Sequence, residues 1–245
     1  MRLLLSRTSR VTGTTQYLRM QSDIRLVEQP VLESAPDNWS RAVRETTGEF
    51  VKILCADDLL DPTCLERQES VLELHPKVSM VVSARRIVTA RGHVLIPRLG
   101  LGGNSRHVES LDAVRIMSAN GGNPFGEVGS ILFRGSVLRA CLPWPTTYGY
   151  KISLAMYARV LGRGDMFSLN EVHSSFRIGH KSWSHSVRRT QYRDQRILVD
   201  AVASNFGLRL SRIQRLGMLC RARLRQTMRQ VLTTVARLLD RVLEK

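Results

Sequence analysis

The sequence lacks the features that mark membrane-spanning, secreted and disulfide-bonded proteins. No run of ~18 apolar residues occurs in the 245 residues, so no segment is expected to cross a bilayer as a helix. The four cysteines, Cys55, Cys64, Cys141 and Cys220, form no Cys-x-x-Cys pair, which argues against a structural zinc site and a disulfide framework. The first ten residues hold only three consecutive leucines, far short of the ~7–15 apolar residues of a secretory signal. We therefore expect a cytoplasmic protein.

Acidic residues are scarce, and the surplus of basic residues is concentrated at the C-terminal end. The chain carries 37 basic and 21 acidic residues, a net charge of +16. Residues 207–245 alone carry ten basic and two acidic residues, which is a charge of +8. The remaining residues carry 27 and 19 in mixed order, so the rest of the chain has only a mild bias that does not by itself indicate nucleic-acid binding.

Strands and helices alternate through most of the chain, which predicts an α/β domain. Ile24–Val27 is expected to be a strand, and Asn38 is expected to cap a helix over 39–46. Phe50–Leu54 is almost continuously apolar, as expected for a strand that is buried on both faces. Asp61 as N-cap, followed by proline, predicts a helix that ends near the next proline.

The alternation continues beyond that helix, and the sequence as a whole predicts a mixed, mostly parallel sheet flanked by helices. The later elements that we expect are strands at 78–83 and 86–89 followed by a hairpin turn at 91–92, a loop at 97–106, a helix near 110–118, a strand at 128–133, a helix from about 151 to 161 and a strand at 165–169. The expected organisation is an irregular N-terminal segment (1–22), an α/β domain (23–186) and a helical, basic C-terminal region (187–245).

The C-terminal region has the pattern of an amphipathic helix. Its apolar residues recur with a period close to 3.6, at positions 213, 216, 220, 224, 228, 231, 235, 238 and 242. The other face of this helix is rich in arginine. Three interpretations stay open: a helix that packs its apolar face on its own domain, a helix in the interface of an anionic membrane, and nucleic-acid binding. The last is the weakest, because no aromatic residue stands among the arginines to stack on bases.

Two adjacent carboxylates, Asp57 and Asp58, follow the expected strand at 50–54. Open α/β sheets bind their ligands at the carboxyl ends of strands, and two like charges side by side suggest a bound cation there. Oxygen ligands point to Mg²⁺ or Mn²⁺. The alternative is that the pair only caps the following helix, a position for which Asp61 is better placed.

Several motifs follow one another in a characteristic order. They are Asn38-Trp39-Ser40-Arg41-Ala42, Thr47-Gly48-Glu49-Phe50 leading to Cys55-Ala56-Asp57-Asp58-Leu59-Leu60, Asn123-Pro124-Phe125-Gly126-Glu127, Leu132-Phe133-Arg134, Leu154, Tyr157, Arg159, Gly164-Asp165 and Phe176-Arg177. Together they resemble family-2 glycosyltransferases of the GT-A fold. The resemblance covers roughly residues 23–186 and rests on the order and spacing of the motifs rather than on any one of them.

The resemblance implies a GT-A-like fold and a reaction. A sugar would move from a nucleotide-diphosphate donor to a lipid-linked or polysaccharide acceptor with the help of Mg²⁺ or Mn²⁺. By position in the motifs, Asn38 would contact the donor, and Asp57 would contact the donor ribose or the metal. Asp58 would bind the donor diphosphate by ligating the metal.

His180 matches a C-terminal histidine of the family that reaches the metal or the diphosphate in several members. The resemblance therefore implies a second metal ligand at His180. The alternative, an ordinary loop histidine among basic neighbours, stays open for His180 and more so for His173 and His185.

The chain departs from the family pattern in two places. Residues 1–22 show no counterpart of the first βαβ unit, which cradles the nucleotide base, so we expect that unit to be missing. The family's general base is an aspartate, but the matching residue is Ser153, whose hydroxyl cannot accept a proton at neutral pH. Glu127 is the nearest carboxylate by motif and could substitute, unless it is only a solvated loop acid.

These departures predict slow sugar transfer, or none, by the chain as it stands. The alternative function is a non-catalytic protein that keeps the fold and binds a partner or an anionic membrane surface through residues 207–245.

Overall fold

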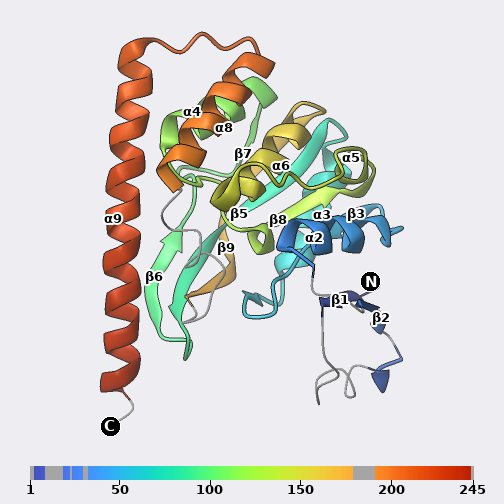
Figure 1. The fold of residues 1–245 in the computed structure, drawn as a ribbon. Helices are drawn as coiled ribbons and strands as arrows, with labels where there is room; N and C mark the ends of the chain where they lie inside the picture. Colours follow the sequence, from blue (N-terminus) through green and yellow to red (C-terminus); the bar gives the residue numbers. More distant parts are fainter. Residues whose placement is uncertain (1–2, 9–18, 23, 30–32, 179–190, 244–245) are drawn as a thin grey trace.

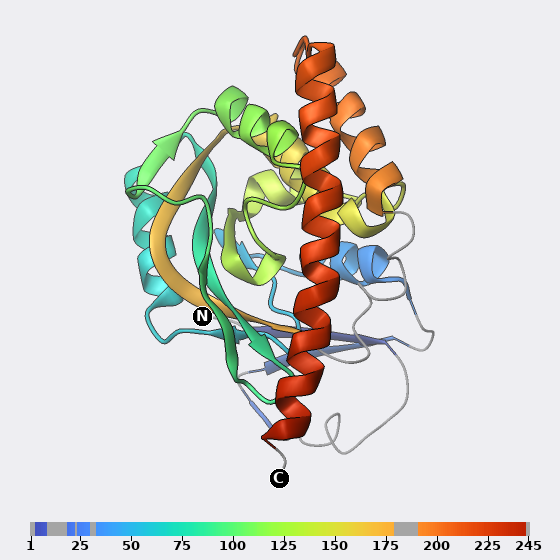
Figure 2. The ribbon, with the colours of Figure 1, turned by 90° about the vertical axis from the view of Figure 1, so that its left-hand side faces the viewer.

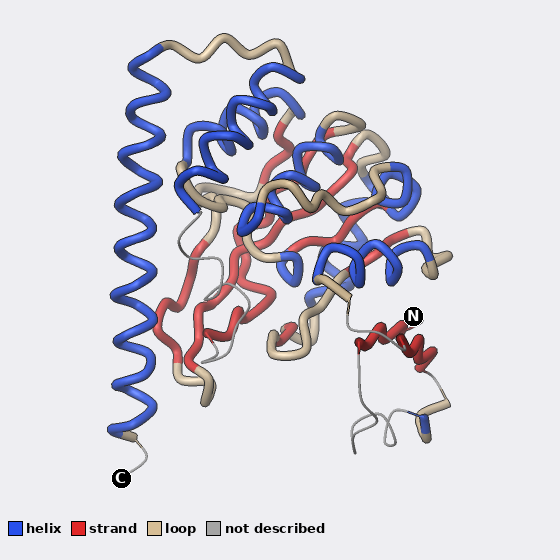
Figure 3. The backbone as a smooth tube through the Cα atoms, in the orientation of Figure 1, coloured by secondary structure: helices blue, strands red, loops and turns tan. Residues whose placement is uncertain are grey.

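A seven-stranded mixed sheet with helices on both faces forms the centre of the fold (Figures 1 and 3). The computed structural model describes residues 3–8, 19–22, 24–29, 33–178 and 191–243. The strands of this sheet are β3 (Phe50–Lys52), β4 (Leu59–Leu60), β5 (Val78–Thr89), β6 (Val94–Leu99), β7 (Arg106–Val108), β8 (Ile131–Arg134) and β9 (Asp165–Ile178).

The strand order is β3-β8-β5-β9-β4, with β6 paired to β5 and β7 paired to β9. The mixed sheet, its flanking helices and the C-terminal helix confirm the expected fold class. The balance of strand directions differs from our expectation of mostly parallel pairing, because only β5 and β9 pair in parallel within this sheet. The chain reverses before β8 and again in the β5–β6 hairpin, and each reversal produces an antiparallel pair.

Alternate side chains of β5 enter two separate hydrophobic cores. The helices of the domain are α2 (Ala35–Arg44), α3 (Cys64–Leu74), α4 (Ser110–Asn120), α5 (Gly135–Ala140) and α6 (Ile152–Leu161), with short 3-10 turns at Val128–Ser130 and Gly149–Lys151. Met80 and Val82 join the larger core beside α2, α4, α5 and α6, whereas Val81 joins a smaller core with Leu72 of α3. The strand is buried along almost its whole length because both its faces are covered.

Two helix starts differ from the expected ones. The side chain of Ser34, not Asn38, caps α2 by accepting a hydrogen bond from the N–H of Asp37 at 3.3 Å. Helix α3 begins at Cys64, since the Asp61 carboxylate accepts two hydrogen bonds from Arg86 instead of capping the helix. An ion-pair partner on a neighbouring strand outweighs the local capping preference, and nothing in the local sequence indicates that partner.

Several segments are more regular than expected. The strand expected at 165–169 continues to Ile178 as β9, and β6 extends into the expected loop as far as Leu99. Within residues 1–22, which we expected to be irregular, β1 (Leu3–Thr8) pairs in parallel with β2 (Ile24–Gln29) as a separate two-stranded sheet.

The C-terminal region forms α8 (Gln191–Asn205) and α9 (Arg212–Val242). A capping box starts α9, in which the side chains of Ser211 and Gln214 each bind the other's backbone N–H. The helix packs against α4, α8 and β5, and Figure 2 shows it standing in front of the domain along its whole length. Among the described residues, no helix is both long and apolar enough to cross a membrane.

The side of α9 that packs on the domain is not the apolar stripe recognised in the sequence. The residues buried against the domain are Met218, Ala222, Ala236 and Asp240. The stripe itself is exposed along its whole length, for example at Leu224, which is 61% exposed. The interpretation in which this stripe covers the helix's own domain is therefore wrong.

Helix α9 approaches the end of α4 closely because a glycine stands there. Gly121 has a φ of +72° and ends α4 in the left-handed conformation. A Cβ at this position would lie 2.6 Å from the backbone nitrogen of Ala222 and 2.8 Å from the carbonyl oxygen of Met218. A larger residue at 121 would therefore push α9 away.

We expect Gly121→Ala to destabilise the protein more than Gly102→Ala does. Gly102 has a similar φ of +74°, but an added Cβ would have no atom within 4 Å, so its substitution measures only the conformational cost, about 1 kcal/mol. Gly121→Ala adds a backbone clash, which should cost a further ~1–3 kcal/mol. Urea unfolding of both variants measures the difference, and equal losses would show that α9 is not held at this point.

Lys52, the last residue of β3, is half-buried beside the cleft-lining residues. The Nζ of Lys52 donates hydrogen bonds to Oε1 of Gln68 at 2.7 Å and to the carbonyl oxygen of Ile131 at 3.3 Å. Burial lowers the pKa of Lys52 to about 8, and the nearby Cys64 acts in the opposite direction. The unfolded chain therefore binds more protons at this residue between pH 8 and the ordinary value of 10.5.

Within that window the unfolded state carries a proton on Lys52 that the folded state lacks. A rise in pH removes this advantage of the unfolded state, so the free energy of unfolding should increase. Between pH 8 and pH 10, we expect the free energy of unfolding of the parent to rise by roughly 1–3 kcal/mol relative to that of Lys52→Met. Chemical denaturation at a series of pH values measures it. Lys77→Met, at an exposed position, is the control and should follow the parent.

Candidate functional site

A wide cleft of about 1650 Å³ opens between α2, the end of β3 and the start of α6. The polar residues that line it include Asn38, Asp57, Asp58, Glu127, Lys151, Ser153 and Arg177. Five of these, namely all except Lys151 and Arg177, are site residues predicted from the sequence. His180 and His185 lie outside the described residues.

Asp58 is the most enclosed carboxylate of the cleft, with 7% of its surface exposed. Its N–H donates to the carbonyl oxygen of Cys55, which closes the turn after β3, and its Oδ1 accepts the backbone N–H of Arg177 at 3.1 Å. Burial raises the pKa of Asp58 to about 7, with smaller contributions from the Asp57 and Glu127 carboxylates, while the hydrogen bond from Arg177 opposes the rise. A bound cation would relieve the cost of ionising this carboxylate.

Arg177 fastens the acidic turn to the sheet. Pairing of Leu59 with Ser175 brings the end of β9 beside the turn. From there, the Arg177 guanidinium donates from Nε to the carbonyl oxygen of Asp57 at 2.8 Å and from Nη1 to that of Ala90 at 2.7 Å. One side chain thus joins the turn to the β5–β6 hairpin.

Glu127 enters the cleft on a loop shaped by Asn123. The Oδ1 of Asn123 accepts the N–H groups of Phe125 and Gly126, an Asx turn that bends the chain. Gly126 follows with a φ of +97°. The Glu127 carboxylate then forms an ion pair with Arg85 of β5, whose side chain is only 4% exposed. Glu127 is therefore more than a solvated loop acid.

Ser153 and Tyr157 stand one turn apart on α6. The Tyr157 hydroxyl donates to the carbonyl oxygen of Gly126 at 3.1 Å, which holds the Glu127 loop against the helix. Burial raises the pKa of Tyr157 well above its ordinary value, and the Glu127 carboxylate adds to this, whereas a hydrogen bond with Ser153 opposes it. The cleft residues Ser153 and Glu127 therefore both lie near the Tyr157 hydroxyl.

Lys151 is a cleft residue that sequence reasoning missed. It is 5% exposed, and burial lowers its pKa to about 7. Arg229 and Arg225 of α9 act in the same direction, while Asp194 of α8 acts in the opposite one. Its place immediately before an apolar helix was the only signal in the sequence, because no motif includes it.

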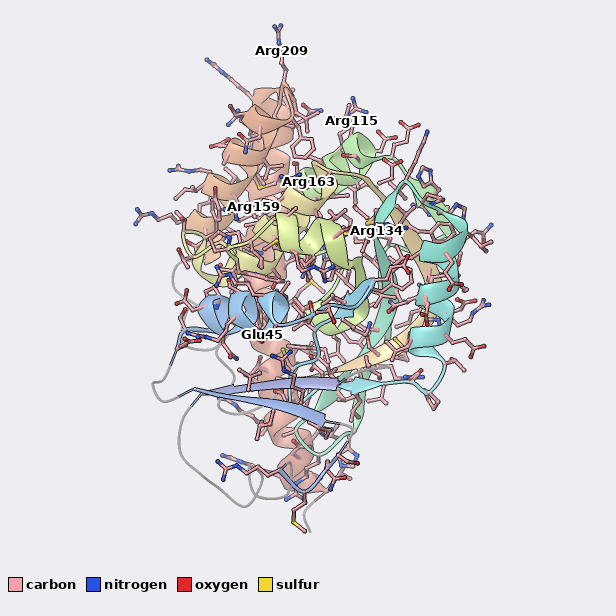
Figure 4. The ribbon with its side chains drawn as sticks, turned by 90° about the vertical axis from the view of Figure 1, so that its right-hand side faces the viewer. Glu45, Arg115, Arg134, Arg159, Arg163 and Arg209 are labelled. Atoms are coloured by element: carbon pink, nitrogen blue, oxygen red, sulfur yellow. The ribbon has the colours of Figure 1, made fainter. Side chains whose placement is uncertain are left out.

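Two residues of interest in the sequence are structural in their contacts. His173 is buried on β9 with its Nε2 3.4 Å from Glu171, and it is not among the residues that line the cleft. Arg159 donates from the outer side of α6 to the carbonyl oxygens of Cys141 at 3.1 Å and Pro143 at 2.5 Å (Figure 4). Arg159 therefore stabilises backbone after α5, whereas His173 contacts a carboxylate on its own strand.

The carboxylates of the turn suit a metal that a bound diphosphate would help to hold. In the part of the chain that the structure describes, no group of three or more His, Cys, Asp or Glu side chains is arranged to bind a metal. Mg²⁺ in phosphate sites commonly takes only one or two carboxylates and completes its coordination with phosphate and water. Asp57 and Asp58 fit that requirement, because Asp58 is buried beside the Asp57 and Glu127 carboxylates and a cation there would offset their charge.

Solved structures of similar fold are glycosyltransferases. S. aureus TarS 1–349 in complex with UDP-GlcNAc is 14% identical, with a TM-score of 0.60 over 85% of this chain and 58% of that one. The mannosyltransferase PcManGT from Pyrobaculum calidifontis, solved with GDP-Man and Mn²⁺, is 13% identical, with a TM-score of 0.55 over 100% of this chain and 78% of that one. No family model matches the chain, and no curated protein sequence matches it significantly.

The chain thus spans a little over half of the TarS 1–349 structures that it matches. Likeness at this level of identity shows the fold alone, and membership of glycosyltransferase family 2 stays a prediction. The chain has a glycosyltransferase-like fold.

Proposed function

We propose that this protein transfers a sugar from a nucleotide-diphosphate donor to a lipid-linked or saccharide acceptor. The observation that carries the proposal is the meeting of Asn38, Asp57, Asp58 and Glu127 in one cleft of a glycosyltransferase-like fold. At about 1650 Å³ the cleft exceeds the ~300–1,000 Å³ typical of small-molecule sites, so it has room for a donor and part of an acceptor.

The donor would bind at the acidic turn. Asp58, with Asp57 beside it, would hold Mg²⁺ or Mn²⁺ together with the donor diphosphate, and Asn38 would contact the donor from α2. Such a metal supplies Lewis-acid stabilisation of the departing diphosphate. The neighbour solved with GDP-Man and Mn²⁺ supports this choice. A metal contact from His180 stays a prediction.

Glu127 is the residue best suited to accept the proton of the acceptor hydroxyl. Ser153 lines the same cleft but has no basic group, so we assign it a positioning role through its hydrogen bond with Tyr157. The ion pair with Arg85 of β5 holds the Glu127 carboxylate in this cleft.

Asp58→Asn should abolish the Mn²⁺ binding that depends on a nucleoside diphosphate, because an amide is a much poorer ligand than a carboxylate. Isothermal titration calorimetry with UDP and GDP measures this. Asp61→Asn is the matched control, since Asp61 pairs with Arg86 and does not line the cleft. Equal binding by the parent and Asp58→Asn would remove the donor site from this turn.

Glu127→Gln should slow sugar transfer by ~10²–10⁴, because the proton acceptor is lost together with its ion pair to Arg85. A panel of nucleotide sugars with lipid-linked and saccharide acceptors measures transfer, and circular dichroism checks the fold. Glu66→Gln, an exposed change on α3 outside the cleft, is the control. Unaltered transfer by Glu127→Gln would exclude Glu127 as the base.

The second candidate is a non-catalytic protein that binds a nucleoside diphosphate with the same cleft. Ser153 in place of a basic group, and the engagement of Glu127 by Arg85, favour it. Diphosphate-dependent Mn²⁺ binding by the parent without transfer to any acceptor of the panel would support this candidate over the enzyme.

A further inference from the structure

The outward face of α9 is an apolar surface without a described partner in this chain. Nine side chains form what we call the outer stripe: Ile213, Leu216, Cys220, Leu224, Met228, Val231, Val235, Leu238 and Val242. Every one of them is exposed, and the eight apart from the cysteine range from 45% to 84% exposed. A continuous apolar stripe of this length is unfavourable in water and marks an interaction surface.

The outer stripe points directly away from the domain. At roughly 100° per residue, the buried residues Met218, Ala222, Ala236 and Asp240 lie about 140–180° around the helix from the first residue of the stripe. Figure 2 shows the same arrangement, with α9 in front of the domain and its outer side facing the viewer. One face of α9 therefore packs on the domain, and the opposite face is exposed.

Arginines border the outer stripe on both sides. At the same ~100° per residue, four of them lie about 80–120° from the stripe on one side: Arg212, Arg223, Arg237 and Arg241. Arg221 and Arg225 lie at similar angles on the other side, where they donate to the carbonyl oxygens of Ala119 and Asn120 of α4. The only acidic residue of α9, Asp240, is buried against the domain. The outer surface of α9 thus combines an apolar centre with positively charged edges.

We propose that α9 lies in the plane of an anionic bilayer surface, with the outer stripe among the acyl chains and Arg212, Arg237 and Arg241 at the level of the lipid phosphates. An apolar face with basic borders is the arrangement that binds anionic membranes through burial and charge together. At ~1.5 Å per residue the 31-residue helix would lie on the membrane over about 46 Å.

Two other occupants fit the surface less well. A second copy of the chain would bring two rows of arginines together without exposed acids on either helix, and like charges repel. Nucleic acid would use the arginines but leave the apolar stripe in water, and α9 has no aromatic side chain for bases to stack on. Charge and apolar surface together therefore favour lipid. The inference goes beyond the proposed function and stands whether or not sugar is transferred.

Co-sedimentation of the full chain with vesicles tests the proposal. The parent should bind phosphatidylcholine vesicles that contain phosphatidylglycerol and bind pure phosphatidylcholine at least ~10-fold more weakly, because arginines gain affinity only from anionic lipid. The triple variant Leu224→Ser, Val231→Ser, Leu238→Ser should lose at least ~10-fold in affinity for the anionic vesicles. These side chains are 55–61% exposed, so the variant should keep the circular dichroism of the parent.

The matched control is the triple variant Met20→Ser, Leu74→Ser, Val94→Ser, which removes three side chains that are 53–78% exposed on other elements. It should bind anionic vesicles like the parent. Changing the bordering residues Arg212, Arg237 and Arg241 to Gln should weaken anionic binding at least ~10-fold and leave binding to pure phosphatidylcholine unchanged.

Three results would overturn the proposal. The first is equal binding of anionic vesicles by the parent and the outer-stripe variant. The second is dimerisation of the parent in analytical ultracentrifugation that the outer-stripe variant abolishes, with no vesicle binding by the parent, which would assign the stripe to a second copy. The third is salt-sensitive binding of single-stranded RNA that the outer-stripe variant retains, again without vesicle binding.

Discussion

The parallel ladder between β5 and β9 is the constraint on which the rest of the molecule depends. It runs from the pairing of Val78 with Asp165 to the pairing of Thr89 with Ile178, with register shifts near Ala84. Both helix layers pack on these strands. β9 places Arg177 in the cleft, and Arg85 of β5 pairs with the cleft residue Glu127. The shift places an extra stretch of β9 opposite a short stretch of β5, so the strands bend and their later halves reach the acidic turn.

Buried charged side chains lie close to charges of the same sign in and around the cleft. Asp58 is buried beside two other carboxylates, and its main compensation is the N–H of Arg177. Glu127 has Arg85 as its partner, and Lys151 lies buried near further cations. Such an arrangement costs folding free energy that an apolar core would not, and it is tolerated because the ladder fixes the strands that carry it. A ligand with a diphosphate and a divalent cation would compensate both signs of charge.

Much of this organisation could be predicted from local sequence, and the missing parts are those set by contacts between distant residues. The apolar run of β5, the hairpin after it and the helical period of α9 follow from patterns of a few residues. The strand directions, and the ion pair with Arg86 that takes Asp61 away from its helix, depend on tertiary packing. Lys151 belongs to no motif, and the charges that surround it come from α8 and α9, which lie far away in the sequence.

Helix α9 shows most clearly what periodicity can and cannot determine. The pattern of apolar residues says which side chains share a face, but not whether that face meets the domain or the surroundings. The close approach at Gly121 settles it, because the backbone of α9 contacts the end of α4 through its other side. Arg221 and Arg225 bind the last carbonyl oxygens of α4 there, and the chain passes from that point into the loop that carries Glu127. We therefore expect changes on the inner face of α9 to affect the cleft and changes in the outer stripe to leave it intact, so that surface binding and cleft chemistry can be separated by mutation.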